Sequence, residues 1–157
     1  MSLVRQAVAG DIAELVRLRA MLFESLGSHH AAPDAVASQG WRESLAEVLA
    51  VQVTAPDMRI LVVDGDDGLA ACGVGTIEVR LPNPRLRNGR LGQVFGVVTD
   101  PAYRRRGHSR AIMEGLLGWF RSREVARVDL NASREGAPLY RDLGFVEHPD
   151  PTMSWRP

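Results

Sequence analysis

The sequence predicts an α/β fold: a mixed, mostly antiparallel central sheet with one parallel pair of strands and with helices on both faces. Strand and helix patterns alternate along the 157 residues. Three strand patterns in the middle of the chain follow one another through short turns, which is typical of antiparallel neighbours. A strand, a helix and a strand then follow at 91–99, 109–124 and 127–131. Such a crossover is right-handed and sets its two strands parallel.

The first part of the chain supplies one strand and two helices. Residues 3–8 form the first strand pattern, and four leucines then recur at spacings of three and four, which predicts a helix with one buried face. Asp11, with Glu14 three residues later, predicts a capping box at the start of this helix, and Gly27 predicts its end. A second helix is predicted over 34–55, where apolar residues again recur at helical spacing.

The next segments form the predicted antiparallel part of the sheet. The run RILVVDGDDG (59–68) is a strand that enters a tight Asp/Gly turn, and LAACGVGTIEVRL (69–81) returns from it. Asn88-Gly89 is a strong turn signal in the arginine-rich stretch that follows. Residues 91–99, LGQVFGVVT, are rich in β-branched residues and apolar at most positions, so we expect a central strand there.

The last part of the chain completes the crossover and adds a terminal segment. Apolar residues recur every four positions in the helix predicted over 109–124. A strand follows at 127–131, and then a short helix that ends at Gly144. Residues 145–155 are expected to add a terminal strand.

Length, charge and hydropathy restrict the class of protein. The length fits a single domain over 1–157 with a core of its own. Because 19 basic and 19 acidic residues give a net charge of zero, we expect no nucleic-acid partner. No run approaches the length of a membrane span, and Asp11 and Glu14 interrupt the apolar residues near the N-terminus. We therefore expect a cytoplasmic protein without a membrane partner.

The composition also excludes several kinds of chemistry. Cys72 is the only cysteine, so an intramolecular disulfide and a cysteine-based zinc site are excluded, and we expect no metal. Cys72 lies in an apolar strand, which favours a small buried residue over a nucleophile. All the basic residues are arginines, so a Schiff-base lysine and a P-loop are excluded as well.

The stretch DPAYRRRGHSRAI (100–112) lies between the central strand and the helix that follows it, and it predicts an anion site. A helix N-terminus offers backbone N–H groups and the positive end of the macrodipole. Gly107 lets the backbone adopt unusual dihedrals and lets an anion come close, and Ser109 can cap the helix or donate to a phosphate. The spacing lacks the G-x-G-x-x-G fingerprint of a dinucleotide-binding Rossmann fold.

At these residues the chain resembles the GCN5-related N-acetyltransferase (GNAT) family. The family signature Arg/Gln-x-x-Gly-x-Gly/Ala, often preceded by Pro-x-Tyr, matches residues 101–109, with Ser109 in place of the last Gly or Ala. His108 stands where the family commonly has an aliphatic residue. The stretch LNASREGAPLYRDLGF (130–145) resembles a later strand, the helix after it and the tyrosine-containing turn of the family. The resemblance is strongest from about residue 91 to 146, and the predicted element order agrees with the family topology.

The resemblance implies acetyl-CoA as a co-substrate. Strand backbone near residue 98 would pair with the pantetheine arm, N–H groups of 105–110 would wrap the pyrophosphate, and arginine side chains would reach the 3′-phosphate or remain solvated. We therefore expect the cofactor to be bound by Val97, Val98, Thr99, Arg104, Arg105, Arg106, Gly107, His108, Ser109, Arg110, Asn131 and Ser133.

The resemblance also implies the catalytic groups. Tyr140 matches the general acid of the family, which gives the departing thiolate its proton; the alternative is a packing residue on the short helix. The strand 91–99 has no carboxylate, so Glu78 is the first candidate for the base and Glu24 the second, each with a solvated surface residue as the alternative. A water relay without a dedicated base is equally consistent with the sequence.

The predicted partner is an amine acceptor, either a small molecule or a peptide. We expect its pocket between the first two helices, the loop between them and the arginine-rich turn of residues 80–90, which either selects an acidic acceptor or is an exposed hairpin. His29 and His30 in the loop are expected to be surface residues. A non-catalytic acyl-CoA-binding regulatory domain is the alternative function, and a homodimer is left open.

Overall fold

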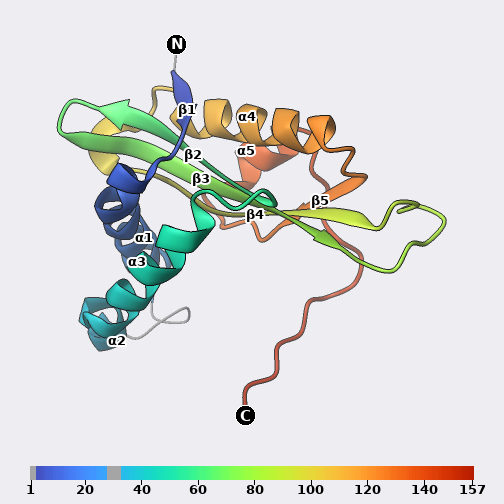
Figure 1. Cartoon of the computed structure of the whole chain (residues 1–157), viewed down its shortest axis with the longest axis horizontal. Coiled ribbons are helices and arrows are strands. Elements are labelled where there is room, and N and C mark those ends of the chain that lie inside the picture. The colour runs from blue at the N-terminus through green and yellow to red at the C-terminus, as the bar shows by residue number, and fades with distance from the viewer. Residues whose placement is uncertain (1–2, 28–32) are drawn as a thin grey trace.

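The computed structural model describes residues 3–27 and 33–157, and a five-stranded mixed sheet forms its centre (Figure 1). The strands lie in chain order, and all neighbours are antiparallel except the last pair, which is parallel. The predicted fold class is confirmed. The strands are β1 (Val4–Gln6), β2 (Met58–Gly65), β3 (Gly68–Val79), β4 (Arg90–Thr99) and β5 (Arg127–Leu130).

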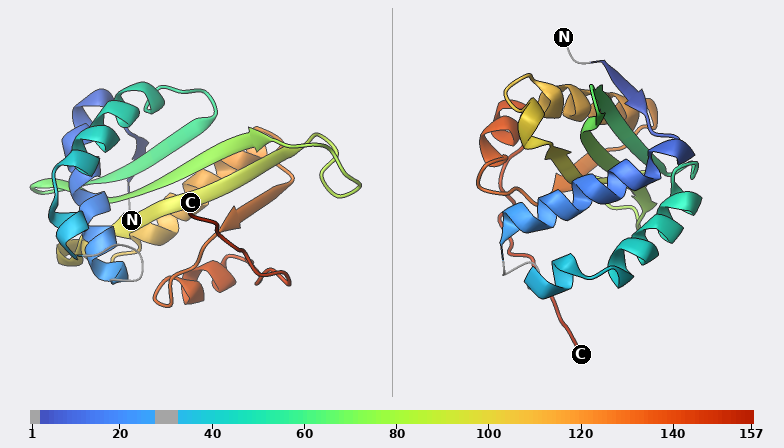
Figure 2. Two further views of the ribbon diagram at one scale, coloured as in Figure 1. Left: turned by 90° about the horizontal axis from the view of Figure 1, so that it is seen from below. Right: turned by 90° about the vertical axis from the view of Figure 1, so that its left-hand side faces the viewer.

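Helices cover both faces of the sheet (Figure 2). One face carries α1 and α3, and the other carries α4, with α5 beside β5. Short 3₁₀ turns lie at Ala9–Asp11 and Pro101–Tyr103. No helix in the described ranges is long and apolar enough to cross a membrane. The helices are α1 (Ile12–Leu26), α2 (Pro33–Ala37), α3 (Gly40–Gln52), α4 (His108–Ser122) and α5 (Ala137–Asp142).

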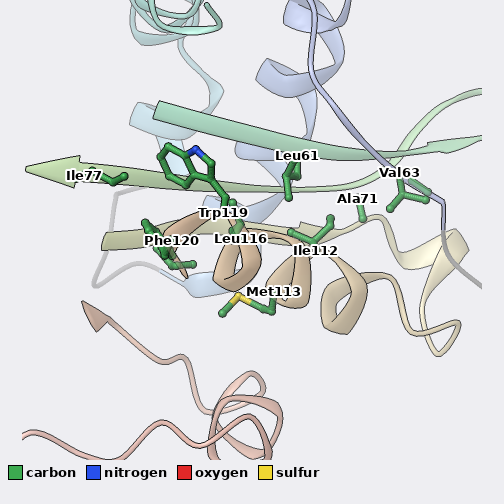
Figure 3. Packing of buried hydrophobic residues seen from close by; sticks show 11 residues of the cluster. Leu61, Val63, Ala71, Ile77, Ile112, Met113, Leu116, Trp119 and Phe120 are labelled. Carbon is green, nitrogen blue, oxygen red and sulfur yellow. The ribbon is translucent and has the colours of Figure 1, made fainter. Parts of the chain in front are cut away.

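The core has two parts, one on each face of the sheet, and β2 shows how the sequence builds both. Leu61 and Val63 point to the α4 face, whereas Ile60 and Val62 point to the α1 face, because successive side chains of a strand alternate. All four are buried, which explains the continuous apolar run. On the α4 face the cluster is completed by residues that include Ile112, Met113, Leu116 and Phe120 (Figure 3).

The predicted second helix over 34–55 is wrong in its continuity, because the chain breaks into α2 and α3. The backbone N–H and the hydroxyl of Ser38 both donate to Ala35 O, which closes a turn and competes with the helix. Trp41 Nε1 then donates to Val36 O at 3.0 Å and satisfies a carbonyl at the end of α2. Side-chain hydrogen bonds therefore end the first helix where apolar periodicity alone predicts continuation.

The predicted terminal strand over 145–155 is also wrong. The structure has no strand in this segment, which is exposed from Val146 onward and extends away from the sheet (Figure 1). Pro149 and Pro151 lack the N–H group that a ladder needs, and proline is disfavoured inside a sheet.

The predicted capping box of Asp11 and Glu14 is replaced by longer-range contacts. The Asp11 carboxylate accepts from Val8 N and from both terminal nitrogens of Arg5 at 2.8–2.9 Å. Glu14 accepts from Leu69 N at 2.8 Å. Both carboxylates therefore join the start of α1 to other parts of the fold.

A second ion-pair network joins α1 to the end of β4. Arg17 pairs with Glu14 at 2.7 Å and with Asp100 at 2.8 Å. The Arg17 guanidinium, and then the Leu69 N–H, lower the pKa of Glu14. The Ala102 N–H, and then Arg17, lower the pKa of Asp100. Both groups therefore stabilise the fold in their ionised form.

We expect acid to weaken the fold through these carboxylates. Their folded pKa values are depressed, so their contribution is fully present above the unfolded values of about 4 and is lost as the pH falls through the folded values. Urea unfolding at pH 7, 4 and 3 measures this loss. Arg17→Gln removes a partner of both carboxylates, costs about 1–3 kcal/mol at pH 7 and flattens the pH dependence. Parallel pH curves for Arg17→Gln and the wild type would contradict the assignment.

Candidate active site

The parallel strands β4 and β5 separate in the middle of β4. Their pairing ends at Val94, which lies opposite Leu130, whereas β4 continues to Thr99. From Phe95 onward the edge of β4 that faces β5 has no strand partner in the described residues. Backbone donors and acceptors of a central strand are thus available to an extended ligand.

A β-bulge reshapes β4 at this point. Phe95 pairs with Val74 and Val98 pairs with Cys72, so two residues of β4, one of them Gly96, lie opposite a single residue of β3. Gly96 has φ +62, which glycine adopts readily. Val98 consequently packs against the α1-side core, and the following residues lead to the start of α4.

The loop between β4 and α4 presents backbone N–H groups. Arg105 and Gly107 both have positive φ, at 62° and 78°, and such alternation in a loop forms a concave anion site. The helical ladder starts with Ala111 N donating to Gly107 O, so the N–H groups of Ser109 and Arg110 lie in the first turn, where no intrahelical acceptor exists. The loop and the first turn of α4 therefore present N–H groups of the kind that bind anions, and the anion site stays a prediction.

Two of the predicted residues hold the loop to the strand. The hydroxyls of Thr99 and Ser109 lie 2.8 Å apart and share a hydrogen bond. The Ser109 side chain is thus directed toward β4. For His108, burial and then the positive charge of Arg106 lower the pKa, so the imidazole is neutral at pH 7.

A groove of about 1050 Å³ runs from the open strand edge across this loop. Its volume is at the upper end of the range for small-molecule sites, about 300–1,000 Å³. Leu22 and Leu26 of α1 form part of its wall. The predicted cofactor residues that line it are Val97, Val98, Thr99, Arg104, Arg105, Gly107, His108, Ser109, Arg110 and Ser133.

Two predicted cofactor residues lie elsewhere. Asn131 lines a smaller adjoining hollow of about 210 Å³ rather than the groove. Arg106 is not among the lining residues, and its guanidinium stands over the ring of Tyr103 at 5.4 Å. Arg110 lines the groove and also forms an ion pair with Asp142.

Tyr140 lines both the groove and the smaller hollow. Its ring packs edge-on against Phe145 at 6.1 Å between ring centres, and a Cβ on Gly136 would lie 2.9 Å from Tyr140 Cε2. Burial raises the pKa of the phenol, so it is protonated at neutral pH. In the described part of the chain its hydroxyl makes no hydrogen bond, so it is available to a bound group.

The structure does not bring Glu78 to the site. Glu78 lies opposite Leu91, six residues before Val97 on β4, which corresponds to about 20 Å along the strand. Its side chain is exposed and paired with Arg80. Glu24 is also exposed and lines neither hollow. Assigning Glu78 to a strand and Glu24 to a helix predicts which face of the element each side chain lies on. The assignment does not predict which end of the sheet holds the ligand.

The arginine-rich turn of residues 80–90 lines neither the groove nor the smaller hollow. Val79 pairs with Arg90 and Ala71 pairs with Thr99. The hairpin (Figure 1) therefore lies at the end of the β3–β4 pair opposite Thr99, which lines the groove. The smaller hollow is built from α1, as expected, and from the bulged part of β4 and the end of β5. His29 and His30 lie outside the described residues.

The sequence interpretation placed the first helix at the acceptor pocket, but it missed Leu22 and Leu26 as lining residues and it missed the bulge. Leu22 and Leu26 look like ordinary core leucines in the sequence. The signal that indicates the bulge is Gly96, because an isolated glycine inside a strand pattern suggests a bulge or a close approach of another group.

The mixed sheet has a separated parallel pair, and a glycine loop leads into a helix at the gap; this is the arrangement of the GNAT fold. The family model described as "Acetyltransferase (GNAT) family" matches residues 20–145. The chain therefore belongs to this family, and the resemblance seen in the sequence is confirmed.

Individual relatives agree with this assignment. A glucosamine 6-phosphate N-acetyltransferase of Trypanosoma brucei brucei is 34% identical over 76 residues, which are 48% of this chain and 52% of the relative. The match thus spans about half of the relative's length.

Solved structures share the fold. A predicted acetyltransferase of Clostridium acetobutylicum, crystallised with acetyl-CoA, has a TM-score of 0.83 at 19% identity, over 98% of this chain and 96% of that one. A GCN5-related N-acetyltransferase of Ralstonia eutropha JMP134 has a TM-score of 0.82 at 19% identity, over 99% of both chains. Both likenesses show that the chain shares the fold of these proteins.

Proposed function

We propose that the protein transfers an acetyl group from acetyl-CoA to the primary amine of an acceptor, by direct attack while both are bound. One observation carries the proposal: Tyr140 stands where the large groove and the smaller hollow meet. Two ligands in these two spaces meet at a protonated phenol whose hydroxyl is available. This is the arrangement that transfer between a cofactor and an acceptor requires.

The groove fits the cofactor part by part. The uncovered edge of β4 from Phe95 to Thr99 offers strand hydrogen bonds to the pantetheine arm. The curled loop and the first turn of α4 offer N–H groups to the pyrophosphate. The Ser109 hydroxyl is engaged by Thr99, which leaves the serine compatible with this path. Arg104 and Arg105 line the groove as cations for the remaining phosphate.

The chemistry needs two proton transfers. The thioester supplies the acetyl group: the amine nitrogen bonds to the carbonyl carbon, and the carbon–sulfur bond breaks. In our proposal Tyr140 gives its hydroxyl proton to the departing sulfur and regains one from solvent. The amine loses its proton to water, because no carboxylate of the described residues lines the smaller hollow. Gln93, Asn131 and Ser133 line this hollow and can hold such a water.

Steady-state turnover tests the proposal. Acetyl-CoA is mixed with a panel of amines that includes glucosamine 6-phosphate, the acceptor in the name of the Trypanosoma relative. Release of the free thiol is then followed, and the acetylated amine is identified by mass spectrometry. Acetylation of at least one amine is expected. Tight acetyl-CoA binding with no acetylated amine would instead favour the non-catalytic acyl-CoA-binding domain, which is the second candidate because no carboxylate of the described residues lines the smaller hollow.

Substitution of Gly107 is expected to separate folding from cofactor binding. A Cβ at this position meets no atom of the described residues within 4 Å, so packing does not oppose it. Its φ of 78° costs alanine about 1 kcal/mol of stability, whereas asparagine tolerates this region better. Gly107→Ala is expected to lower the free energy of unfolding by that amount, and Gly107→Asn by less.

Both variants are expected to weaken acetyl-CoA binding at least tenfold in calorimetry, because each side chain enters the space of the pyrophosphate. Unchanged affinity in the folded Gly107→Asn variant would remove this loop from the proposed site.

A further inference from the structure

Arg19 on α1 lies beside the bulge of β4. A Cβ on Gly96 would be 3.3 Å from Arg19 Nη1, so the guanidinium lies close to the strand backbone at the bulge. The guanidinium carbon lies 5.1 Å from the ring centre of Phe23 and 6.0 Å from that of Phe95. Two aromatic rings thus hold one cation in place.

No carboxylate neutralises this cation. All the acidic residues of the chain lie in the described ranges, and none forms an ion pair with Arg19. Arg17, on the same helix, is held by both Glu14 and Asp100. Burial lowers the pKa of Arg19, yet an arginine remains charged at neutral pH. A partly desolvated charge without a counter-ion is unfavourable, which indicates that a ligand supplies the counter-ion.

The position of Arg19 relates it to the smaller hollow. Phe95 and Gly96, which it contacts or approaches, both line that hollow. Leu22, which also lines it, follows Arg19 by three residues and therefore lies on the same face of α1. The same hollow is lined by Tyr140 at its junction with the groove. Arg19 itself is not among the residues that line either space, so it borders the smaller hollow through Phe95 and Gly96.

We infer that Arg19 binds an anionic group of the acceptor, a phosphate or a carboxylate, so that the substrate is an amine that also carries a negative charge. The planar guanidinium suits two-point binding of either group. The inference rests on the proposed function, since it assigns the acceptor to the smaller hollow.

Matched pairs of amines test the inference. Glucosamine 6-phosphate is compared with glucosamine, and 4-aminobutanoate with butylamine, which separates a phosphate from a carboxylate. The wild type is expected to prefer the anionic member of at least one pair tenfold or more in kcat/KM. Arg19→Gln is expected to remove this preference and to leave the neutral amine and the KM for acetyl-CoA unchanged. Arg19→Lys keeps the positive charge but loses the planar guanidinium that binds an anion at two points, so it is expected to retain part of the preference.

The matched control is Arg87→Gln, which removes an exposed hairpin arginine and is expected to change nothing. Equal loss for both members of a pair in Arg19→Gln would overturn the inference, because it would indicate a structural role. A wild type without any preference would overturn it as well.

A binding measurement keeps the two proposals separable. Inorganic phosphate, titrated calorimetrically at constant ionic strength, is expected to bind the wild type more tightly than Arg19→Gln. The difference reports Arg19 alone, since both proteins keep the groove. If this difference is present but no amine is acetylated, the anion site holds and the proposed function fails. If neutral and anionic amines are acetylated equally well, and phosphate binds the wild type and Arg19→Gln equally, the proposed function holds and the anion site at Arg19 fails.

Discussion

Replacing Tyr140 by phenylalanine is expected to lower kcat by about 100- to 1,000-fold, the usual contribution of a positioned general acid. The substitution removes only the phenolic hydroxyl group, and this hydroxyl makes no hydrogen bond to the described part of the protein. The ring still packs against Phe145 and beside Gly136. The melting temperature and the calorimetric affinity for acetyl-CoA are therefore expected to match the wild type.

The second tyrosine of the chain provides the matched control. Tyr103 also lines the groove, but its hydroxyl accepts from Asp66 N at 2.9 Å and so has a structural partner. Tyr103→Phe is expected to cost some stability and to leave kcat within a few-fold. A kcat for Tyr140→Phe equal to that of the wild type would show that the sulfur obtains its proton elsewhere, and the mechanism would then rest on positioning alone.

The part of the site that could be predicted from the sequence is the part built by neighbouring residues. A strand, a glycine loop and a helix start follow one another directly in 91–110, so their order fixes their geometry. The same holds for Tyr140, which lies on a short helix just after β5. The anion site and the position of the phenol thus follow from local structure and one crossover.

Long-range contacts explain what could not be predicted. Glu14 has a capping-box spacing, but Leu69 N and Arg17 take its carboxylate. Glu78 is a candidate base by residue type, yet the register of β3 and β4 places it about 20 Å along the strand from Val97. Arg17 and Arg19 look alike in a lysine-free sequence, and only the fold shows that one of them has two carboxylates and the other none. Register and ion pairing between distant segments leave no signal in a single sequence.

Ser109→Asp is expected to weaken acetyl-CoA binding by about 100-fold while the fold keeps its stability. The new carboxylate would lie in the first turn of α4, where the macrodipole favours a negative charge. It can still accept a hydrogen bond from the Thr99 hydroxyl, which now pairs with Ser109. The same charge opposes a pyrophosphate bound at this turn. Like charges about 4 Å apart repel by about 4 kcal/mol at an effective dielectric constant of 20. We expect solvent in the open groove to reduce this repulsion to roughly two thirds, and an energy of about 2.7 kcal/mol corresponds to the 100-fold loss of affinity.

Ser109→Asn separates charge from size in this experiment. The asparagine side chain has nearly the shape of aspartate and no charge, so its affinity for acetyl-CoA is expected to fall by only a few-fold. The calorimetric difference between the Asp and Asn variants measures the electrostatic part, and added salt should narrow it through screening. If the two variants bind acetyl-CoA equally well, the pyrophosphate does not lie at the start of α4. The groove would then hold its ligand by the edge of β4 and the arginine side chains rather than by the helix N-terminus.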